Sequence, residues 1–105
     1  MATTDRRIEL HNKLVEILGS RNVYFQPPES IKLKYPCIVY HTSIGRSFNA
    51  DHIMYLFTDS YDVTVMDSDP DSQIPDRVLR SFQMIRKEKP YPADGIYHSP
   101  FVLYY

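Results

Sequence analysis

Residues 61–85 read YDVTVMDSDPDSQIPDRVLRSFQMI, and the hydrophobic period of this stretch changes once along its length. The first seven residues alternate between apolar and mostly polar side chains, which is the pattern of a strand buried on one face. Beyond an acidic turn, apolar residues recur at every third or fourth position, which puts them on one side of a helix. The stretch therefore predicts a strand over 61–67, a turn, and a helix that continues through Ile85. The apolar helix face comprises Ile74, Val78, Leu79, Phe82 and Ile85.

The turn between this strand and this helix is acidic and carries residues suited to begin a helix. Asp71 or Ser72 can accept a hydrogen bond from an N–H group that the first helical turn leaves free. Pro75 fits that first turn, where its missing N–H group breaks no hydrogen bond, and Asp76 places negative charge near the positive end of the helix dipole. We expect a structural role, as turn and helix cap, for Asp67, Asp69, Pro70, Asp71, Ser72, Pro75 and Asp76.

The rest of the chain predicts one more helix and four more strands. The helix begins at Thr3 or Thr4 and stops at Gly19, because glycine tolerates the left-handed conformation that ends many helices. Its core-facing side is predicted to hold Ile8, Leu10, Leu14, Val15, Ile17 and Leu18. Two arginines in its first turn, Arg6 and Arg7, oppose the helix dipole, so they are either exposed charges or contacts for a partner. The strands are predicted over 22–26, 37–42, 52–57 and 96–105, the last interrupted near Ser99 and Pro100 and preceded by an irregular segment over 91–95.

These elements predict an α+β fold with a single, mainly antiparallel β-sheet and two α-helices packed on one face. The strands over 52–57 and 61–67 are expected to pair as a hairpin. The other face of the sheet is too apolar for free solvent, which indicates a partner such as another copy of the chain. At 105 residues the chain is expected to form one domain, 1–105.

Composition argues against several classes of function. The formal net charge of −1 disfavours a general nucleic-acid binder. The single cysteine, Cys37, allows neither an intramolecular disulfide nor a cysteine-based metal site, and its β-rich neighbours favour a small buried core residue over a nucleophile. No apolar run approaches the roughly 20 residues that span a bilayer. We therefore expect a protein of the reducing cytosol with no membrane partner.

Catalytic and metal-binding patterns are incomplete in this chain. The carboxylates of the 67–71 turn are spaced like the start of a calcium loop, but Ser72 and Val78 stand where the loop needs glycine and glutamate. The four histidines lack a zinc-ligand spacing such as i, i+4 on a helix. No nucleophile elbow, phosphate loop or dinucleotide fingerprint occurs. We expect neither an enzyme nor a bound metal or cofactor.

One predicted loop carries large side chains that a simple connection does not need. Residues 43–50 contain a glycine and small polar residues typical of a loop, together with Ile44, Arg46 and Phe48. Aromatic and arginine side chains are frequent anchors of protein interfaces. These three residues are therefore candidates for contacts between subunits or with another partner protein, the alternative being that the loop folds back onto its own domain.

Four segments together resemble a family of small bacteriophage proteins. They are YPCIVY at 35–40, the Ala50–Asp51 pair ahead of a strand, YDVTVMD at 61–67 and DPDSQIPD at 69–76. The chain is similar in these segments to the tail-completion, or tail-terminator, proteins of long-tailed phages, which are also called minor capsid or head-to-tail joining proteins. The similarity extends over roughly residues 26–78 and is weak beyond Ile85.

The resemblance implies a structural virion protein of the phage neck. Such a subunit forms a ring, expected to be hexameric, that ends the tail tube and presents a face to the head connector or head-closure protein. It is assembled in the cytoplasm of the bacterial host, and it binds no specific nucleic acid although DNA can pass through the ring. The family supplies no catalytic residues, and the partner expected for Ile44, Arg46 and Phe48 is then a neighbouring subunit or the tail tube. A head-closure or adaptor role in the neck and a small non-viral binding module are the alternatives.

Overall fold

The computed structural model describes residues 3–43 and 59–105, which form two helices and one sheet. The elements in chain order are α1 (Thr3–Leu18), β1 (Val23–Phe25), β2 (Cys37–Thr42), β3 (Ser60–Asp67), α2 (Ile74–Arg80), β4 (Ile85–Lys87), β5 (Tyr91–Ala93) and β6 (Ile96–Tyr104). The strand predicted over 52–57, and its hairpin with the next strand, lie outside the described residues.

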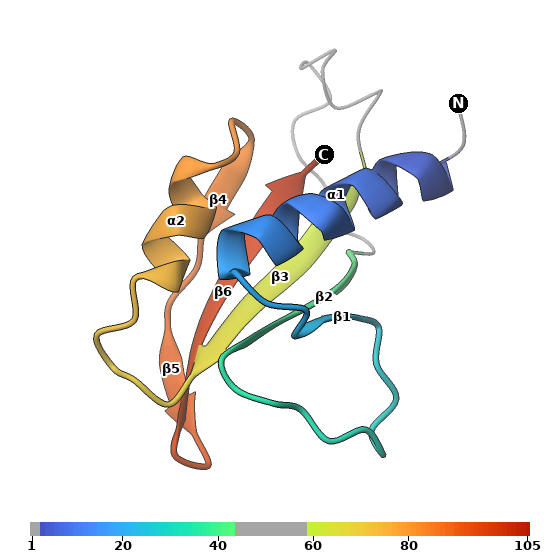
Figure 1. The fold of residues 1–105 in the computed structure, drawn as a ribbon. Coiled ribbons are helices and arrows are strands. Elements are labelled where there is room, and N and C mark those ends of the chain that lie inside the picture. The colour runs from blue at the N-terminus through green and yellow to red at the C-terminus, as the bar shows by residue number, and fades with distance from the viewer. Residues whose placement is uncertain (1–2, 44–58) are drawn as a thin grey trace.

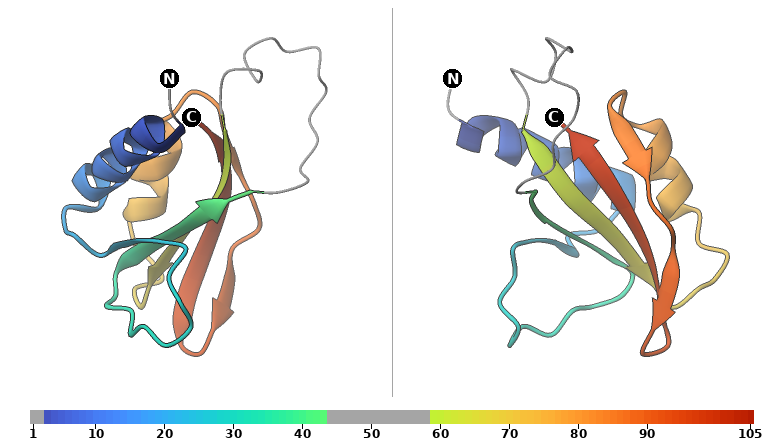
Figure 2. Two further views of the ribbon diagram at one scale, coloured as in Figure 1. Left: turned by 90° about the vertical axis from the view of Figure 1, so that its right-hand side faces the viewer. Right: turned by 180° about the vertical axis from the view of Figure 1, so that it is seen from behind.

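The sheet has the order β1-β2-β3-β6-β4, and β5 also pairs with β6. β1 runs parallel to β2, whereas the other described pairs are antiparallel. Both helices lie on the same face of this sheet, as Figure 1 and the left view of Figure 2 show. The predicted α+β class, with one mainly antiparallel sheet and two helices on one face, is confirmed.

β3 is the strand on which the sequence pattern is clearest. Tyr61, Val63 and Val65 are buried, and the residues between them are only half-buried, so the alternation holds along the whole strand. β3 lies between β2 and β6, and Val63 is paired with Tyr40 on one side and Phe101 on the other. Its buried face therefore forms the centre of the core under the helices.

α1 covers this core through a line of leucines four residues apart. Leu10, Leu14 and Leu18 are buried, and the N–H of Gly19 donates to the carbonyl of Val15 at 2.9 Å where the helix ends. Gly19 has a φ of +82°, the left-handed conformation expected of it. The prediction for Ile8 was wrong: its side chain is exposed. Residues i and i+2 of an α-helix are about 200° apart around its axis, so the side chain of Ile8 points away from the side that holds Leu10.

α2 is shorter than predicted, because it ends at Arg80 rather than continuing through Ile85. At its end the Ser81 N–H donates to the Val78 carbonyl at 3.1 Å, and the Ser81 hydroxyl donates to the Arg77 carbonyl at 2.6 Å. Serine competes in this way with the regular hydrogen bonds of a helix. Phe82 and Ile85 still pack against the core, but from a turn and from β4. Their helical spacing was therefore a misleading signal.

The C-terminal segment holds more strand than predicted. Residues 91–95 are not irregular: β5 pairs with β6 across a two-residue turn of Asp94 and Gly95, whose φ values are +54° and +76°. Positive φ at both positions is typical of the tight hairpin turns that Asp-Gly favours. β6 is also continuous rather than interrupted. β4 pairs with it after Pro100 and β5 pairs with it before Pro100, so neither strand needs a hydrogen bond from the proline nitrogen, which has no hydrogen to donate.

Candidate functional site

The acidic turn uses its carboxylates to hold its own backbone. The Asp67 carboxylate accepts a hydrogen bond from the Asp69 N–H at 3.0 Å, and the Asp69 carboxylate accepts one from the Asp71 N–H at 2.9 Å. Such bonds from an aspartate to the backbone two residues later are a common device of turns. Two of the three carboxylates thus already have a role in the geometry of the chain.

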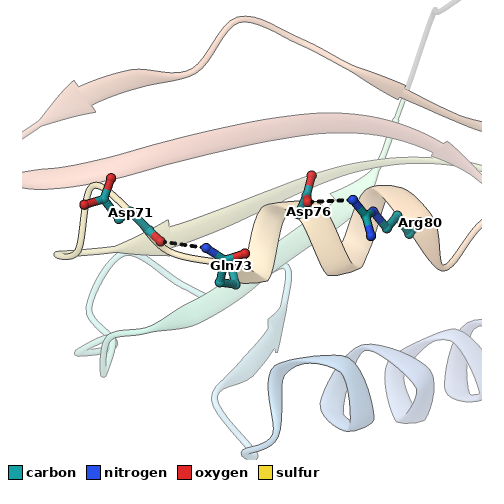
Figure 3. A network of polar contacts seen from close by, with 4 residues as sticks. All are labelled: Asp71, Gln73, Asp76 and Arg80. Carbon is teal, nitrogen blue, oxygen red and sulfur yellow. Dashed lines mark hydrogen bonds and ion pairs between the residues drawn. The ribbon is translucent and has the colours of Figure 1, made fainter.

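As predicted, Ser72 accepts a hydrogen bond at the start of α2, although Gln73 and not Ser72 occupies the N-cap position. Gln73 is the N-cap residue, with φ −87° and ψ −6°, and it makes no capping hydrogen bond through its side chain. Because Gln73 already has helical dihedral angles, the hydroxyl of Ser72 accepts from the N–H of Ile74 at 3.3 Å instead of reaching further into the helix. Pro75 and Asp76 do lie in the first turn, as predicted. Figure 3 shows this region, with the Gln73 amide donating to the Asp71 carbonyl.

Within residues 3–43 and 59–105, no group of three or more His, Cys, Asp or Glu side chains is placed to hold a metal ion. In the same part of the chain, no helix is long and apolar enough to cross a membrane.

The N-terminal half of α1 is attached to the sheet by a polar and aromatic cluster that includes Arg7 and His11. The Tyr40 hydroxyl, on β2, is 2.7 Å from Nδ1 of His11 and accepts a longer bond from Arg7 at 3.4 Å. The Arg7 guanidinium also lies over the Phe25 ring, 4.2 Å from its centre. Burial, helped by the charge of Arg7, lowers the pKa of His11, whereas burial raises the pKa of Tyr40. Arg7 is therefore a contact within the fold rather than an exposed charge.

A second cluster attaches the other side of α1 to the end of β6. The Tyr105 hydroxyl donates to the Glu9 carboxylate at 2.6 Å, and burial together with this bond raises the pKa of Tyr105 to about 12. Arg6 and Lys13 lie over the same ring, and Lys13 also lies 4.7 Å from the centre of the Phe82 ring. An open hollow of about 360 Å³ borders these side chains. Its charges face aromatic rings of the protein itself, so it gives little evidence for a ligand.

Cys37 lies at the start of β2 and is fully buried, as the sequence predicted. Burial, followed by the negative charge of Asp67, raises the pKa of its thiol to about 11. A thiol in that state is protonated at neutral pH and is a poor nucleophile.

The exposed large apolar side chains are the remaining candidates for function. Among the described residues they are Ile8, Ile31, Tyr35, Tyr91 and Tyr97. All but Ile8 belong to two surfaces at opposite edges of the sheet. We call these the hairpin surface, which is residues 91–98, and the segment surface, which is residues 26–36.

The hairpin surface presents an aromatic residue on each of its two faces. Tyr91 stacks on the ring of His98, with ring centres 4.9 Å apart and planes 12° from parallel. Tyr97 is paired with Pro92 and is one residue from His98, so it points to the opposite face of the hairpin. Both tyrosines remain more than 40% exposed, at 48% and 43%. Neither ring is used to close the core.

The segment surface joins β1 to β2 along the other edge. It is held by the Ile31 N–H, which donates to the Pro28 carbonyl at 3.2 Å, and by the Lys34 N–H, which donates to the Tyr24 hydroxyl at 3.4 Å. These bonds use backbone donors, so the side chains of Ile31 and Lys34 stay in solvent. Lys32 and Tyr35 are exposed beside them.

The face of the sheet away from the helices is mixed in character. Val39 and Val102 are buried there, while Asp62, Thr64 and Met66 are half-buried. The sequence-based candidates for an interface, Ile44, Arg46 and Phe48, lie outside the described residues, so their role stays a prediction. The two edge surfaces were missed by sequence reasoning, although Asp94-Gly95 between apolar residues is a recognised hairpin signal that could have located one of them.

Comparison with known proteins leaves the family of this chain open. No protein-family model, no curated protein and no solved structure matches it.

Proposed function

We propose that this chain is a structural protein of a bacteriophage neck. In this role it forms a ring, hexameric by analogy with the tail-terminator proteins that its sequence resembles, which ends the tail tube and joins the tail to the head connector. It would be assembled in the host cytoplasm and reside in the virion, at the junction of head and tail.

The observation that carries the proposal is the position of the exposed aromatic side chains. Tyr91 and Tyr97 lie on the edge of the sheet formed by β5 and β6, whereas Ile31 and Tyr35 follow β1 at the opposite edge. A dimer with two-fold symmetry needs one self-complementary surface, but a ring needs two different surfaces that meet head to tail. Two separate apolar surfaces on one small subunit are suited to the second arrangement.

The charged and aromatic groups of α1 support a structural role in a different way. Arg7 and His11 contact Tyr40, and Glu9 accepts a bond from Tyr105. These groups fasten the helix to the sheet at both of its sides. Side chains that hold a helix rigidly on the sheet suit a subunit that must keep its shape in an assembly, since a preformed surface loses less entropy on binding.

The proposal is tested in the phage that encodes this chain. An amber mutation in its gene should yield DNA-filled heads together with unjoined or overlong tails in electron micrographs of the lysate, and the wild-type gene supplied from a plasmid should restore joined particles. Normal particles in the non-permissive host would refute a role in the neck.

The same micrographs separate the two neck functions. Loss of a tail terminator leaves tails of uncontrolled length, because nothing stops polymerisation of the tube. Loss of a head-closure or adaptor protein leaves tails of normal length and heads that leak or fail to join. Tail lengths measured in the mutant lysate therefore decide between the leading function and its alternative.

A further inference from the structure

We propose that the hairpin surface of one copy of this chain docks on the segment surface of the next copy. The inference rests on the proposed ring and names the two surfaces that close it. The occupant of each edge is thus a second copy of the same chain, bound head to tail.

The first step of the reasoning concerns the edge of β5. Ala93 and Ile96 flank the two-residue turn and face each other across it, so the backbone polar groups of Ala93 point to β6 and those of its neighbour Pro92 point outward. Proline has no N–H group to offer to an incoming strand. This edge is therefore unsuited to lengthening the sheet, and contact through the side chains of Tyr91 and Tyr97 is favoured instead.

The second step is charge. Lys32 and Lys34 are exposed on the segment surface, which has one acidic residue, Glu29. Asp94 is exposed at the tip of the hairpin, and Asp69 and Asp71 are exposed in the turn that follows β3. Within the described residues none of these lysines or aspartates forms an ion pair.

The acidic turn lies beside the hairpin, because Asp67 at the end of β3 is paired with Tyr97. One edge of the sheet thus combines aromatic rings with negative charge, and the other combines apolar groups with net positive charge. Complementary charge of this kind selects partners and fixes their register. Lys89 precedes the hairpin and reduces the contrast at its far end, so the match is best near the tip.

The third step is position. Figures 1 and 2 show the hairpin of β5 and β6 and the loop between β1 and β2 at the same end of the molecule, away from the labelled chain ends, and the strand order places them at opposite edges of the sheet. Copies in a closed ring are related by rotation alone, so two surfaces that meet must lie at the same height along the ring axis. Two surfaces at one end of the subunit meet this requirement for a ring axis that runs along the length of the subunit.

The experiment uses two variants of the full chain, each with one altered edge. The hairpin variant carries Tyr91→Ser and Tyr97→Ser, and the segment variant carries Ile31→Ser and Lys34→Glu. Ile8→Ser is the matched control, since Ile8 is as exposed as the two tyrosines but belongs to neither edge. Far-ultraviolet circular dichroism and thermal melting establish that each variant is folded, and native mass spectrometry with analytical ultracentrifugation gives the oligomeric state.

We expect the wild-type chain and the Ile8→Ser control to form the same ring. Each edge variant should be monomeric, with self-association weakened by roughly tenfold or more. An equimolar mixture of the two variants should give a 1:1 heterodimer and nothing larger, because one intact hairpin surface and one intact segment surface remain between them. Higher salt should weaken the heterodimer.

Other outcomes overturn the inference. A wild-type chain that stays monomeric at its highest soluble concentration, folded edge variants that keep the ring, or a mixture that stays monomeric would each show that these edges do not meet. The outcome is separate from that of the neck function. A confirmed heterodimer with normal phage particles in the amber test would keep the interface and refute the function, and the reverse result would keep the function and refute the interface.

Discussion

The two helices cover the same face of the sheet but differ in how far their apolar pattern matches their backbone. α1 has 16 residues, and its line of leucines ends where the helix ends, at Leu18 just before Gly19. α2 has seven residues, yet the spacing that predicted it continues through Phe82 and Ile85 in a turn and a strand. The difference teaches that such spacing identifies the residues that face the core, but not the length over which the chain stays helical.

The largest expected effect tests whether α1 is the main cover of the core. Leu14 is fully buried, so Leu14→Ala should lower the free energy of unfolding by about 2–5 kcal/mol, through lost burial and the cavity left behind. Val78→Ala in α2 removes fewer atoms, and we expect a loss of about 1–3 kcal/mol. Urea denaturation followed by circular dichroism measures both. A larger loss for Val78→Ala than for Leu14→Ala would reverse the ranking of the two helices.

The second effect tests the position of Phe82 outside α2. Its ring is half-buried, meets the Tyr105 ring edge-on at 6.1 Å between centres, and lies under Lys13. A fully buried phenylalanine on a helix would lose about 3–5 kcal/mol on truncation. For a half-buried ring in a turn we expect Phe82→Ala to lose about half of that. Urea denaturation of Phe82→Ala, measured in parallel with Leu14→Ala, gives the comparison. A loss of unfolding free energy equal to that of Leu14→Ala would contradict the half-buried position of Phe82 and favour the longer helix that the sequence predicted.

The sequence sufficed for those parts of the fold in which local pattern and tertiary contact agree. β3 alternates because one face is buried along its whole length, and Gly19 ends α1 because its own conformation allows the stop. Both signals lie within the segment that they describe. The fold class follows from them, since a half-buried sheet needs one layer of helices.

The remaining parts depend on contacts that local pattern does not contain. Ser81 ends α2 by hydrogen bonds that any serine in a helix has the option to make, so the residue alone was no stop signal. Ile85 forms a strand because β6 offers it an edge, and Pro100 is tolerated because β4 and β5 leave a gap beside it. The two edge surfaces were missed for the same reason. Exposure of Tyr91, Tyr97, Ile31 and Tyr35 is a property of the folded chain.

A third, smaller effect distinguishes the polar attachments of the helices. α1 is attached through His11, whereas α2 is attached through Arg77, which donates to the Ile17 carbonyl at 3.1 Å. Arginine stays charged at all relevant pH values, but histidine does not. Burial and the charge of Arg7 lower the pKa of His11 below its usual 6.5, so the unfolded chain binds this proton more readily than the folded chain does.

The contribution of His11 to stability is therefore complete above about pH 6.5 and declines as the pH falls below that value. Denaturation curves are measured between about pH 7.5 and about pH 5, roughly one unit or more on either side of that pKa. Over this range the free energy of unfolding should decline more steeply for the wild-type chain than for His11→Gln. Tyr40→Phe is the control. It removes the hydroxyl that contacts His11 but keeps His11 beside Arg7, and the lowered pKa of His11 is caused by burial and by the charge of Arg7. Equal slopes for the wild-type and His11→Gln chains would show that the histidine is not desolvated in the fold.

The smallest expected effect concerns the ion pair of α2. Arg80 and Asp76 are one helical turn apart with a nitrogen–oxygen distance of 3.3 Å, and Figure 3 shows this contact running along the helix. Their side chains are 81% and 57% exposed, so water screens the attraction, and a double-mutant cycle of Asp76→Ala and Arg80→Ala should give a coupling of about 0.3–0.5 kcal/mol that fades at high salt. A coupling of about 1 kcal/mol or more would exceed what an exposed pair of this spacing provides. It would mean that surface charge compensates for the short apolar face of α2. A small coupling would instead mean that α2 is held by the burial of Ile74 and Val78 and by the hydrogen bond from Arg77 to α1.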